Sequence, residues 1–243
     1  MPQSYFVWND IDCRSMGIIM RGPVPIVRPE ERVQHVEIPG RSGDLTELEG
    51  NQIYNSYIQT VSISVRGGYR VRDVYKWLRG SGFVTFSGEP DRKQPGRIIG
   101  AITLNKVSRN LDNWAGELQI YCQPLKQLLT ENTQVITASN TQIINLGDVR
   151  AKPLIKLTPS GTSASITITG NDTPADNTLI LTGLTSGTPV WIDSEIMEVL
   201  NNDKSATLTQ NSAGDFPQLG QGVNTLTGSG WSRLDITKRE RFL

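Results

Sequence analysis

The 243-residue sequence has few of the side chains on which most catalytic and metal sites depend. Its only cysteines are Cys13 and Cys122 and its only histidine is His35, too few for a disulfide framework or a structural zinc shell. No apolar run approaches the roughly 18 residues of a membrane span, and residues 1–6 lack the basic and apolar regions of a secretion signal. We therefore expect no metal, no cofactor, no membrane association, and synthesis in a reducing cytoplasm.

The balance of charges argues against a further class of protein, one that binds nucleic acid or a membrane surface through its overall charge. Lys+Arg and Asp+Glu number 24 each, so no strong overall field would steer the molecule to nucleic acid or to a membrane surface. One local cluster combines cations with aromatic rings, as a nucleic-acid groove does. It comprises Arg66, Arg70, Arg72, Arg79, Tyr69, Tyr75 and Trp77. Because Trp77 also has the spacing of a helix core face, we favour a structural role for it.

Three other groups could carry chemistry but fit it poorly. Cys13 and His35 would form the thiol–imidazole pair of a cysteine hydrolase only within hydrogen-bond reach, and burial of a small apolar Cys13 is the simpler interpretation. The loop at 40–44 lacks the lysine and the spacing of a phosphate loop, which favours a structural turn that presents Arg41. The acidic pairs Asp10/Asp12 and Glu89/Asp91 lack the ligand count of a calcium loop and are expected to be solvated.

The first half of the chain has strand periodicity and one helix. Residues 58–65 and 117–122 alternate apolar with polar side chains, as half-buried strands do, and residues 98–107 predict another strand. Asp73 is placed to cap a short helix whose core face is Val74, Trp77 and Leu78, and Gly80 would end it. The pattern therefore predicts β structure interrupted by a single helix.

From about residue 128 the sequence becomes rich in Thr, Ser, Asn and Gly. Residues 165–170, 178–181 and 190–192 predict short strands, with turns every ~8–12 residues, which is typical of a β-sandwich or barrel. Residues 128–228 hold 4 Lys/Arg against 9 Asp/Glu, whereas residues 1–127 hold 16 against 13. We place a domain boundary near 128, giving domains 1–127 and 128–243, with residues 130–141 as a linker or a first edge strand.

A crowded run of turn residues lies near the end of the chain. Residues 213–219 (AGDFPQL) are followed by Gly220, Gly222 and Asn224 before the strand-like segment 223–227. Turn residues at this density specify backbone conformation rather than side-chain chemistry. The segment therefore favours a structural role over a catalytic one.

The order of these segments resembles the distal tail protein of long-tailed, non-contractile (siphovirus-type) bacteriophages or prophages. In the first half the resemblance includes residues 36–45 (VEIPGRSGDL), the helix ending at Trp77-Leu78, residues 83–86 with 89–91, and residues 120–124 (IYCQP). In the second half it includes residues 191–193, 198–199, 214–219 and 222–225. It covers most of the chain, and the order of the motifs is more specific than any one of them.

The resemblance implies an all-β fold with one short helix. The N-terminal domain would be a β-barrel-like or sandwich-like ring-forming domain, and the C-terminal domain a galectin-like or carbohydrate-module-like β-sandwich. It implies a non-enzymatic homo-hexamer at the virion tail tip that joins the tail tube protein to the tail-tip or tail-associated lysin protein and carries receptor-binding or side-fibre proteins. DNA would only pass through the channel. Loops on a rigid scaffold carry recognition, so we expect Arg41, Asp44, Asp215, Phe216 and Leu219 at subunit or partner contacts.

An alternative function belongs to another class. A carbohydrate-binding module would contact the host cell wall through the second domain, with Trp191 and Phe216 as stacking platforms. The competing interpretation of Trp191 is a core position in an alternating strand. Glycan binding that is lost on removal of either ring would distinguish the two.

Overall fold

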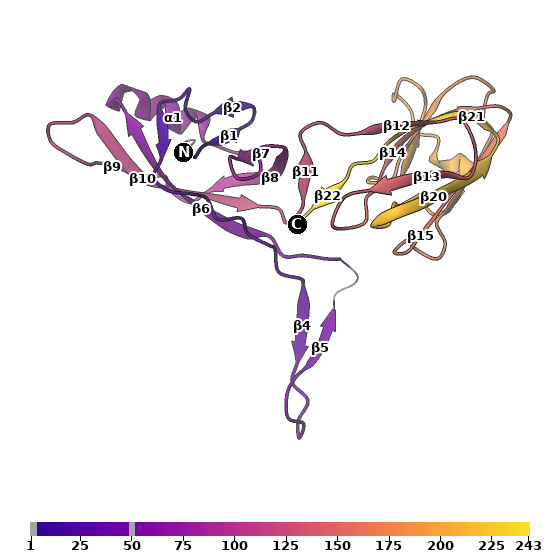
Figure 1. Ribbon diagram of the computed structural model, residues 1–243, viewed down its shortest axis with the longest axis horizontal. Coiled ribbons are helices and arrows are strands. Elements are labelled where there is room, and N and C mark those ends of the chain that lie inside the picture. The colour runs from indigo at the N-terminus through magenta and orange to yellow at the C-terminus, as the bar shows by residue number, and fades with distance from the viewer. Residues whose placement is uncertain (1–3, 49–51) are drawn as a thin grey trace. The chain divides into compact units, whose positions relative to one another are not determined.

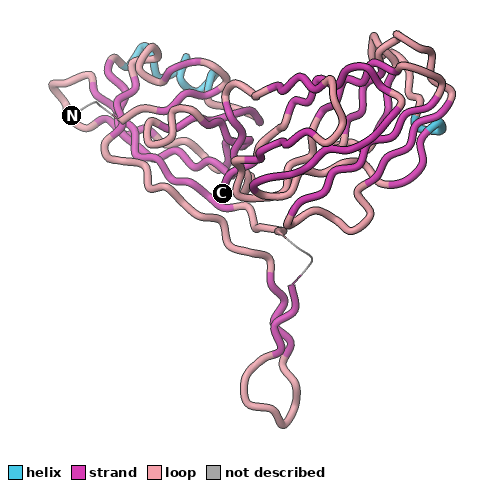
Figure 2. Tube along the Cα trace, turned by 45° about the vertical axis from the view of Figure 1, so that its right-hand side comes forward, coloured by secondary structure: helices cyan, strands magenta, loops and turns pink. Residues whose placement is uncertain are grey.

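A computed structural model describes residues 4–48 and 52–243, so the first three residues of the N-terminal segment discussed above lie outside it. The chain divides into two compact units, residues 1–129 with Leu243 and residues 130–242. Strands dominate both units (Figure 2), and α1 (Val71–Trp77) is the one α-helix among the described residues. None of the described helices is long and apolar enough to cross a membrane.

The first unit is built on one antiparallel sheet with the strand path β2-β1-β7-β8-β10-β6-β3 (Figure 1). Its strands are β1 (Phe6–Trp8), β2 (Ile11–Asp12), β3 (Ile18–Met20), β4 (Val33–Val36), β5 (Leu45–Leu48), β6 (Tyr57–Arg66), β7 (Ser81–Phe86), β8 (Arg92–Ile99), β9 (Leu104–Lys106), β10 (Asn113–Cys122) and β11 (Lys126–Leu128). β9 pairs with β10, and β11 pairs with β8. β4 and β5 pair only with each other among the described strands.

Alternation of side chains along β6 and β10 places the core on one face of this sheet. Val61, Ile63 and Val65 of β6 are almost completely buried, as are Leu118 and Ile120 of β10. The strands pair along their whole length, from Asn113 opposite Arg66 to Cys122 opposite Tyr57. The two alternating segments of the first half are therefore confirmed as strands, and the structure pairs them with each other.

Helix α1 packs its apolar side against this core. Val74 is fully buried, and the Trp77 ring stacks on Phe6 with centroids 5.8 Å apart and planes 8° apart. The indole Nε1 of Trp77 also donates a hydrogen bond to Trp8 O at 3.3 Å. The expected core role of Trp77 is thus confirmed, but the cap is not Asp73: the N-cap residue is Arg70, and Asp73 lies within the first turn.

The strand predicted over residues 98–107 is wrong in its middle. β8 ends at Ile99, and Gly100 has φ 70°, a left-handed backbone angle that breaks the strand. Pairing resumes only at β9, where Leu104 lies opposite Gly116. A Cβ on Gly116 would lie 2.0 Å from Thr103 O, so the close approach of these two backbones requires glycine there.

The second unit is a β-sandwich, as predicted. Its strands are β12 (Thr133–Ile136), β13 (Thr141–Asn145), β14 (Leu154–Pro159), β15 (Ser163–Gly170), β16 (Thr178–Thr182), β17 (Val190–Asp193), β18 (Glu198–Leu200), β19 (Ser212–Gly214), β20 (Gly222–Ser229), β21 (Trp231–Thr237) and β22 (Arg241–Phe242). Two antiparallel sheets, β12-β21-β14-β17-β18 and β13-β20-β15-β16-β19, enclose one aliphatic core. The all-β fold with one short helix is therefore confirmed, while the galectin-like subtype remains a prediction.

Candidate functional site

The β4–β5 hairpin carries the first pair of predicted contact residues. Val36 lies opposite Leu45, so residues 37–44 form the connecting loop. Gly40 and Gly43 have φ angles of 80° and 82°, which only glycine adopts without strain. Arg41 donates its backbone N–H to Ile38 O at 3.1 Å, and the side chains of Arg41 and Asp44 are exposed. The loop thus presents both charged groups to solvent, at the end of the hairpin in Figures 1 and 2.

The described side chains of this hairpin, those of residues 33–45, lie outside the two hydrophobic cores. None of them belongs to either buried cluster. Isolated two-stranded hairpins are at best marginally stable in water. The hairpin therefore suits a surface that gains order by packing on another molecule.

The second predicted segment, residues 214–222, presents Asp215 and encloses Leu219. Asp215 is exposed, and its N–H donates to Thr178 O at 2.9 Å. Gly214 has φ 90°, and a Cβ there would lie 2.2 Å from the same oxygen, so the chain needs glycine before Asp215. Phe216 packs partly buried against the sandwich core. The Leu219 side chain is completely buried in that core and is inaccessible to a partner while the unit is folded.

Three buried asparagines fix the backbone of this loop. The Asn145 amide donates to the carbonyls of Leu219 and Gly220 at 3.3 and 3.2 Å. The Asn177 amide both donates to Gln218 O and accepts from Gln218 N, each at 2.8 Å. Asn224 accepts from Gly220 N and donates to Gly220 O, each at 2.8 Å.

We call Asn145, Asn177 and Asn224 the asparagine clamp. Their side chains supply hydrogen bonds to the backbone of Gln218 and Gly220, which a buried backbone requires, while Leu219 also pairs with the backbone of Ala151. Sequence reasoning noted the glycines of the loop but missed the clamp. The available signal was an asparagine at an inward-facing position of an alternating strand, as at Asn224 after Gly222.

The two rings considered for glycan stacking already have protein contacts. Lys204 Nζ lies 4.0 Å and Lys156 Nζ 5.3 Å from the centroid of the Trp191 ring. The indole Nε1 of Trp191 donates to Asn202 O at 3.0 Å. Phe216, as described above, faces the core of its own unit. Glycan stacking by these residues remains a prediction.

The candidate thiol–imidazole pair is not assembled. Cys13 is completely buried in the first core, where burial raises the pKa of its thiol. His35 is exposed on β4, opposite Thr46. No hydrogen bond between the two is present in the part of the chain that the structure describes, and no group of three potential metal-ligating side chains occurs within residues 4–48 and 52–243.

Of the two acidic pairs, Asp10 and Asp91 are exposed as expected, whereas Asp12 and Glu89 are partly buried in ion pairs. Asp12 forms an ion pair with Arg14, whose hydrogen bond lowers the pKa of Asp12. Glu89 was expected to be solvated, yet its side chain is only 21% exposed and its Oε2 lies 2.6 Å from Nζ of the buried Lys126. Its Oε1 accepts a hydrogen bond from Arg92 at 3.0 Å. Glu89 is therefore a structural ion-pair residue.

The basic C-terminal segment is tied to acidic groups of the second unit. Arg239 binds both carboxylate oxygens of Asp193, at 2.6 and 2.9 Å, and Arg241 Nη2 lies 3.2 Å from Glu195 Oε2. Burial opposes ionisation of Asp193, but the hydrogen bonds from Arg239 and from the Glu195 N–H outweigh it, so the pKa of Asp193 lies below its usual value. The segment is thus held by a two-point arginine–carboxylate contact.

Replacement of Arg239 by alanine should lower the free energy of unfolding at pH 7 by about 2 kcal/mol, because it leaves the carboxylate of Asp193 without its cation. A lowered folded-state pKa stabilises the fold above the unfolded value of about 3.9 and loses that effect as the pH falls through the folded value. The difference between wild type and variant should therefore shrink below about pH 4. Urea titrations at pH 7, 4 and 3 measure it. Arg233→Ala, which removes an exposed pair with Asp235, is the control and should cost less than about 1 kcal/mol.

Known phage proteins are similar to this chain in sequence over the second unit and in fold over nearly its whole length. Residues 146–242 match the family model described as siphovirus-type tail component, C-terminal domain. The structure of the Dit protein of phage SPP1, described as a paradigm of the hub adsorption apparatus in phages that infect Gram-positive bacteria, aligns with a TM-score of 0.79 at 20% identity over 99% of both chains. A baseplate structure of phage p2 aligns with a TM-score of 0.49 at 8% identity, also over 99% of both chains. A search of curated protein sequences finds no match.

Proposed function

We propose that the whole chain is a distal tail protein that forms a hexameric ring at the end of a phage tail, because residues 146–242 match the model of the siphovirus-type tail component family. The proposal depends on two matches taken together, one in sequence and one in fold. The second unit fits the family model, and the fold of the entire chain is that of a phage hub protein. The function is structural rather than enzymatic.

Features of the first unit support a ring. A closed ring needs a heterologous interface, in which two different surfaces of each copy meet. The sheet ends in two short edge strands, β2 and β3, each with one partner among the described strands, and unpaired edges join neighbours unless they are protected. The exposed hairpin loop with Arg41 and Asp44 supplies a separate contact surface. A permanent interface of this kind should bury more than about 1,600 Å² in total.

The ring would join the tail tube protein on one side to a tail-tip or tail-associated lysin protein on the other. Receptor-binding or side-fibre proteins would attach to the second unit, where Asp215 is exposed and its backbone N–H is bonded to Thr178 O. The genome would pass through the bore without specific contacts, in keeping with a net charge of zero. The site of action is the virion tail tip, after synthesis in the bacterial cytoplasm.

Light scattering coupled to size exclusion tests the proposal at several protein concentrations. The expected particle has six times the 26.8 kDa mass of the chain, or twice that mass if two rings stack. The mass should be independent of concentration once the ring closes, because closure removes free interfaces. A chain that stays monomeric at every concentration, while circular dichroism shows native strand content, would contradict the ring.

A further inference from the structure

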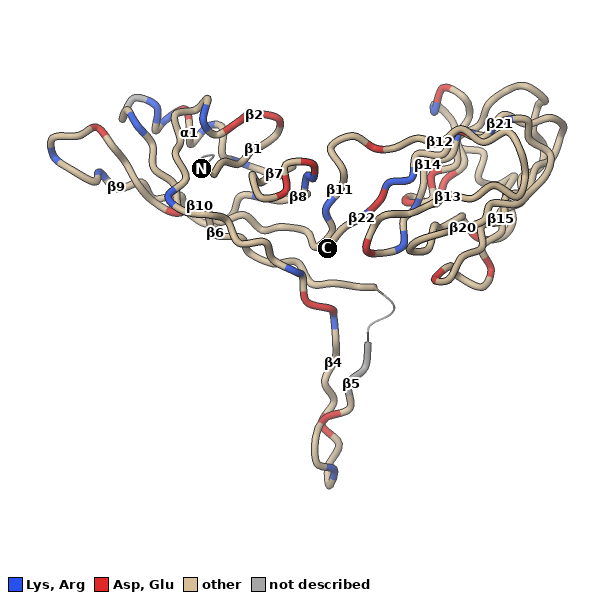
Figure 3. The backbone as a smooth tube through the Cα atoms, viewed as in Figure 1, with Lys and Arg blue, Asp and Glu red and all other residues tan. Residues whose placement is uncertain are grey.

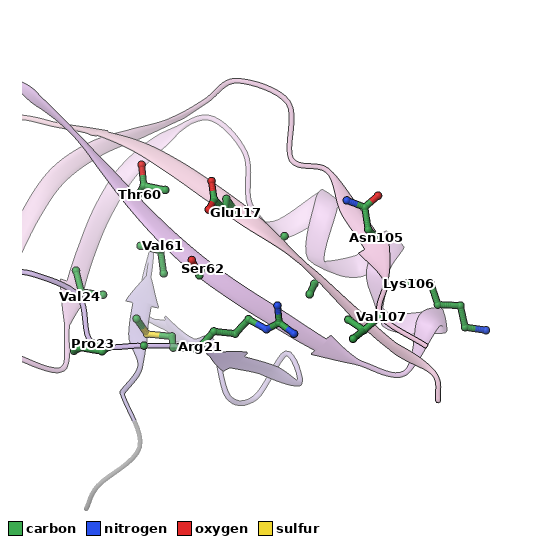
Figure 4. A pocket seen from close by; sticks show the side chains of 14 residues that line it. Arg21, Pro23, Val24, Thr60, Val61, Ser62, Asn105, Lys106, Val107 and Glu117 are labelled. Carbon is green, nitrogen blue, oxygen red and sulfur yellow. The ribbon is translucent and has the colours of Figure 1, made fainter. Parts of the chain in front are cut away.

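A groove on the first unit matches the hairpin loop in charge. The groove has a volume of about 540 Å³ and is bordered by the chain after β3 and by strands β6, β9 and β10 (Figure 4). Its charged residues are Arg21, Lys106 and Glu117, all exposed. None of the three forms an ion pair with another residue in the described ranges. The groove therefore has two cations and one anion outside any ion pair among the described residues, and Lys106 also interacts electrostatically with the exposed Asp112.

The hairpin loop has the opposite set. Glu37, Arg41 and Asp44 are exposed, and none of them takes part in an ion pair within the described part of the chain. The loop thus carries two anions and one cation, the reverse of the two cations and one anion in the groove. Figure 3 shows charged residues of both signs along the hairpin as far as its loop.

Apolar groups accompany the charges on both surfaces. Val107 borders the groove and is 52% exposed, and Ile38 in the loop is 40% exposed. Pro23 forms another wall of the groove. Burial of Ile38 against these side chains would add about 25 cal/mol for each Å² of apolar surface removed from water. The hairpin, whose described side chains lie outside both hydrophobic cores, would gain order by this packing.

We propose that the hairpin loop of one copy docks into the Arg21–Lys106–Glu117 groove of a second copy, and this inference rests on the proposed ring. Glu37 and Asp44 would pair with Arg21 and Lys106, and Arg41 with Glu117. Figure 4 shows Arg21 extending across β6 and Lys106 extending outward from β9, so both cations are available to an incoming loop. The contact joins two different surfaces, which is the heterologous type that closes rings.

Docking within one chain is disfavoured by the direction of the hairpin. Pro23 and Val24 line the groove, and the chain continues from them toward β4. At about 3.3 Å per residue, the four residues of β4 (Val33–Val36) carry the loop about 13 Å away from the start of the hairpin. Figures 1 and 2 both show the hairpin standing away from the sheet of its own unit. The loop therefore meets a groove on another copy.

Two variants, each with one added cysteine, test the contact, since the native Cys13 and Cys122 are completely buried. Full-length Asp44→Cys and Lys106→Cys proteins are mixed and mildly oxidised, so that any disulfide between the two substituted positions must join different copies. Mass spectrometry of the linked peptides identifies it. The control mixture pairs Asp44→Cys with Arg72→Cys, which is exposed on α1. We expect at least about tenfold more linked peptide from the groove pair than from the control pair.

Charge reversal provides a second measurement. Asp44→Lys should weaken assembly by about fivefold in the dissociation constant for each contact, and Lys106→Asp in the same chain should restore it. Equal disulfide yields in the two mixtures would overturn the groove contact, and so would a failure of Lys106→Asp to restore assembly of Asp44→Lys. If light scattering still gives the ring mass, either result leaves the ring intact. A native-like monomer at all concentrations would instead remove the ring and the groove contact together.

Discussion

Replacement of Asn224 by alanine will lower the free energy of unfolding of the second unit by about 3 kcal/mol. The side chain is completely buried, and it bonds the N–H and C=O of Gly220 at 2.8 Å each and Gly222 O at 3.0 Å. Alanine leaves these backbone groups buried without that partner, and each lost partner costs about 1–3 kcal/mol. Calorimetry of the full chain, with hydrogen exchange to identify the unit that unfolds, measures the loss.

The matched control for this variant is Asn202→Ala. Asn202 is exposed in the same unit, and only its backbone carbonyl, which alanine retains, is bonded to Trp191. A change within about 0.5 kcal/mol is expected. The Asn224 variant should also speed exchange of the Gly220 amide, which loses its acceptor. If Asn224→Ala unfolds like the wild type and the Gly220 amide stays protected, the clamp does not stabilise the loop.

The strands were predictable because alternation reports burial on one face. The pattern over residues 58–65 corresponds to β6, with Val61, Ile63 and Val65 in the core. The same logic identified β15 and β16 in the sandwich. The prediction failed after Ile99, because the alternation of polar and apolar side chains carries no information on the backbone angle of a glycine. The break at Gly100 depends on backbone geometry that the pattern does not encode.

The candidate site was only partly predictable for a different reason. The exposed charges Arg41, Asp44 and Asp215 follow from turn residues that flank them. Leu219 was placed with them by proximity in sequence, yet it turns into the core, where its N–H and C=O pair with Ala151 at 2.9 Å. The partners that decide this are distant in sequence, such as Asn145, 74 residues from Leu219. The sequence of the loop itself does not show whether side chains from distant strands bond its backbone.

The buried ion pair of the first unit gives the second large effect that we expect. Replacement of Glu89 by alanine should destabilise that unit by about 3 kcal/mol, because it removes the carboxylate from a buried ammonium. The Lys126 side chain is 6% exposed, with Nζ 2.6 Å from Glu89 Oε2. Lys126 keeps its hydrogen bond to the O atom of Leu243 at 3.1 Å, but the carboxylate that balances its charge at 2.6 Å is lost. Urea unfolding at pH 7 measures the change.

Three further variants separate the ion pair from the packing around it. Asp91→Ala removes a carboxylate that is 67% exposed and 3.8 Å from Arg92, so it should cost less than about 1 kcal/mol. Lys126→Met should cost less than Glu89→Ala, because Glu89 keeps Arg92 and remains partly in water. The double variant Glu89→Gln, Lys126→Met should recover much of the loss, since an apolar replacement of a buried pair is often nearly neutral. If the double variant is as unstable as Glu89→Ala, the loss comes from packing and not from an unbalanced charge.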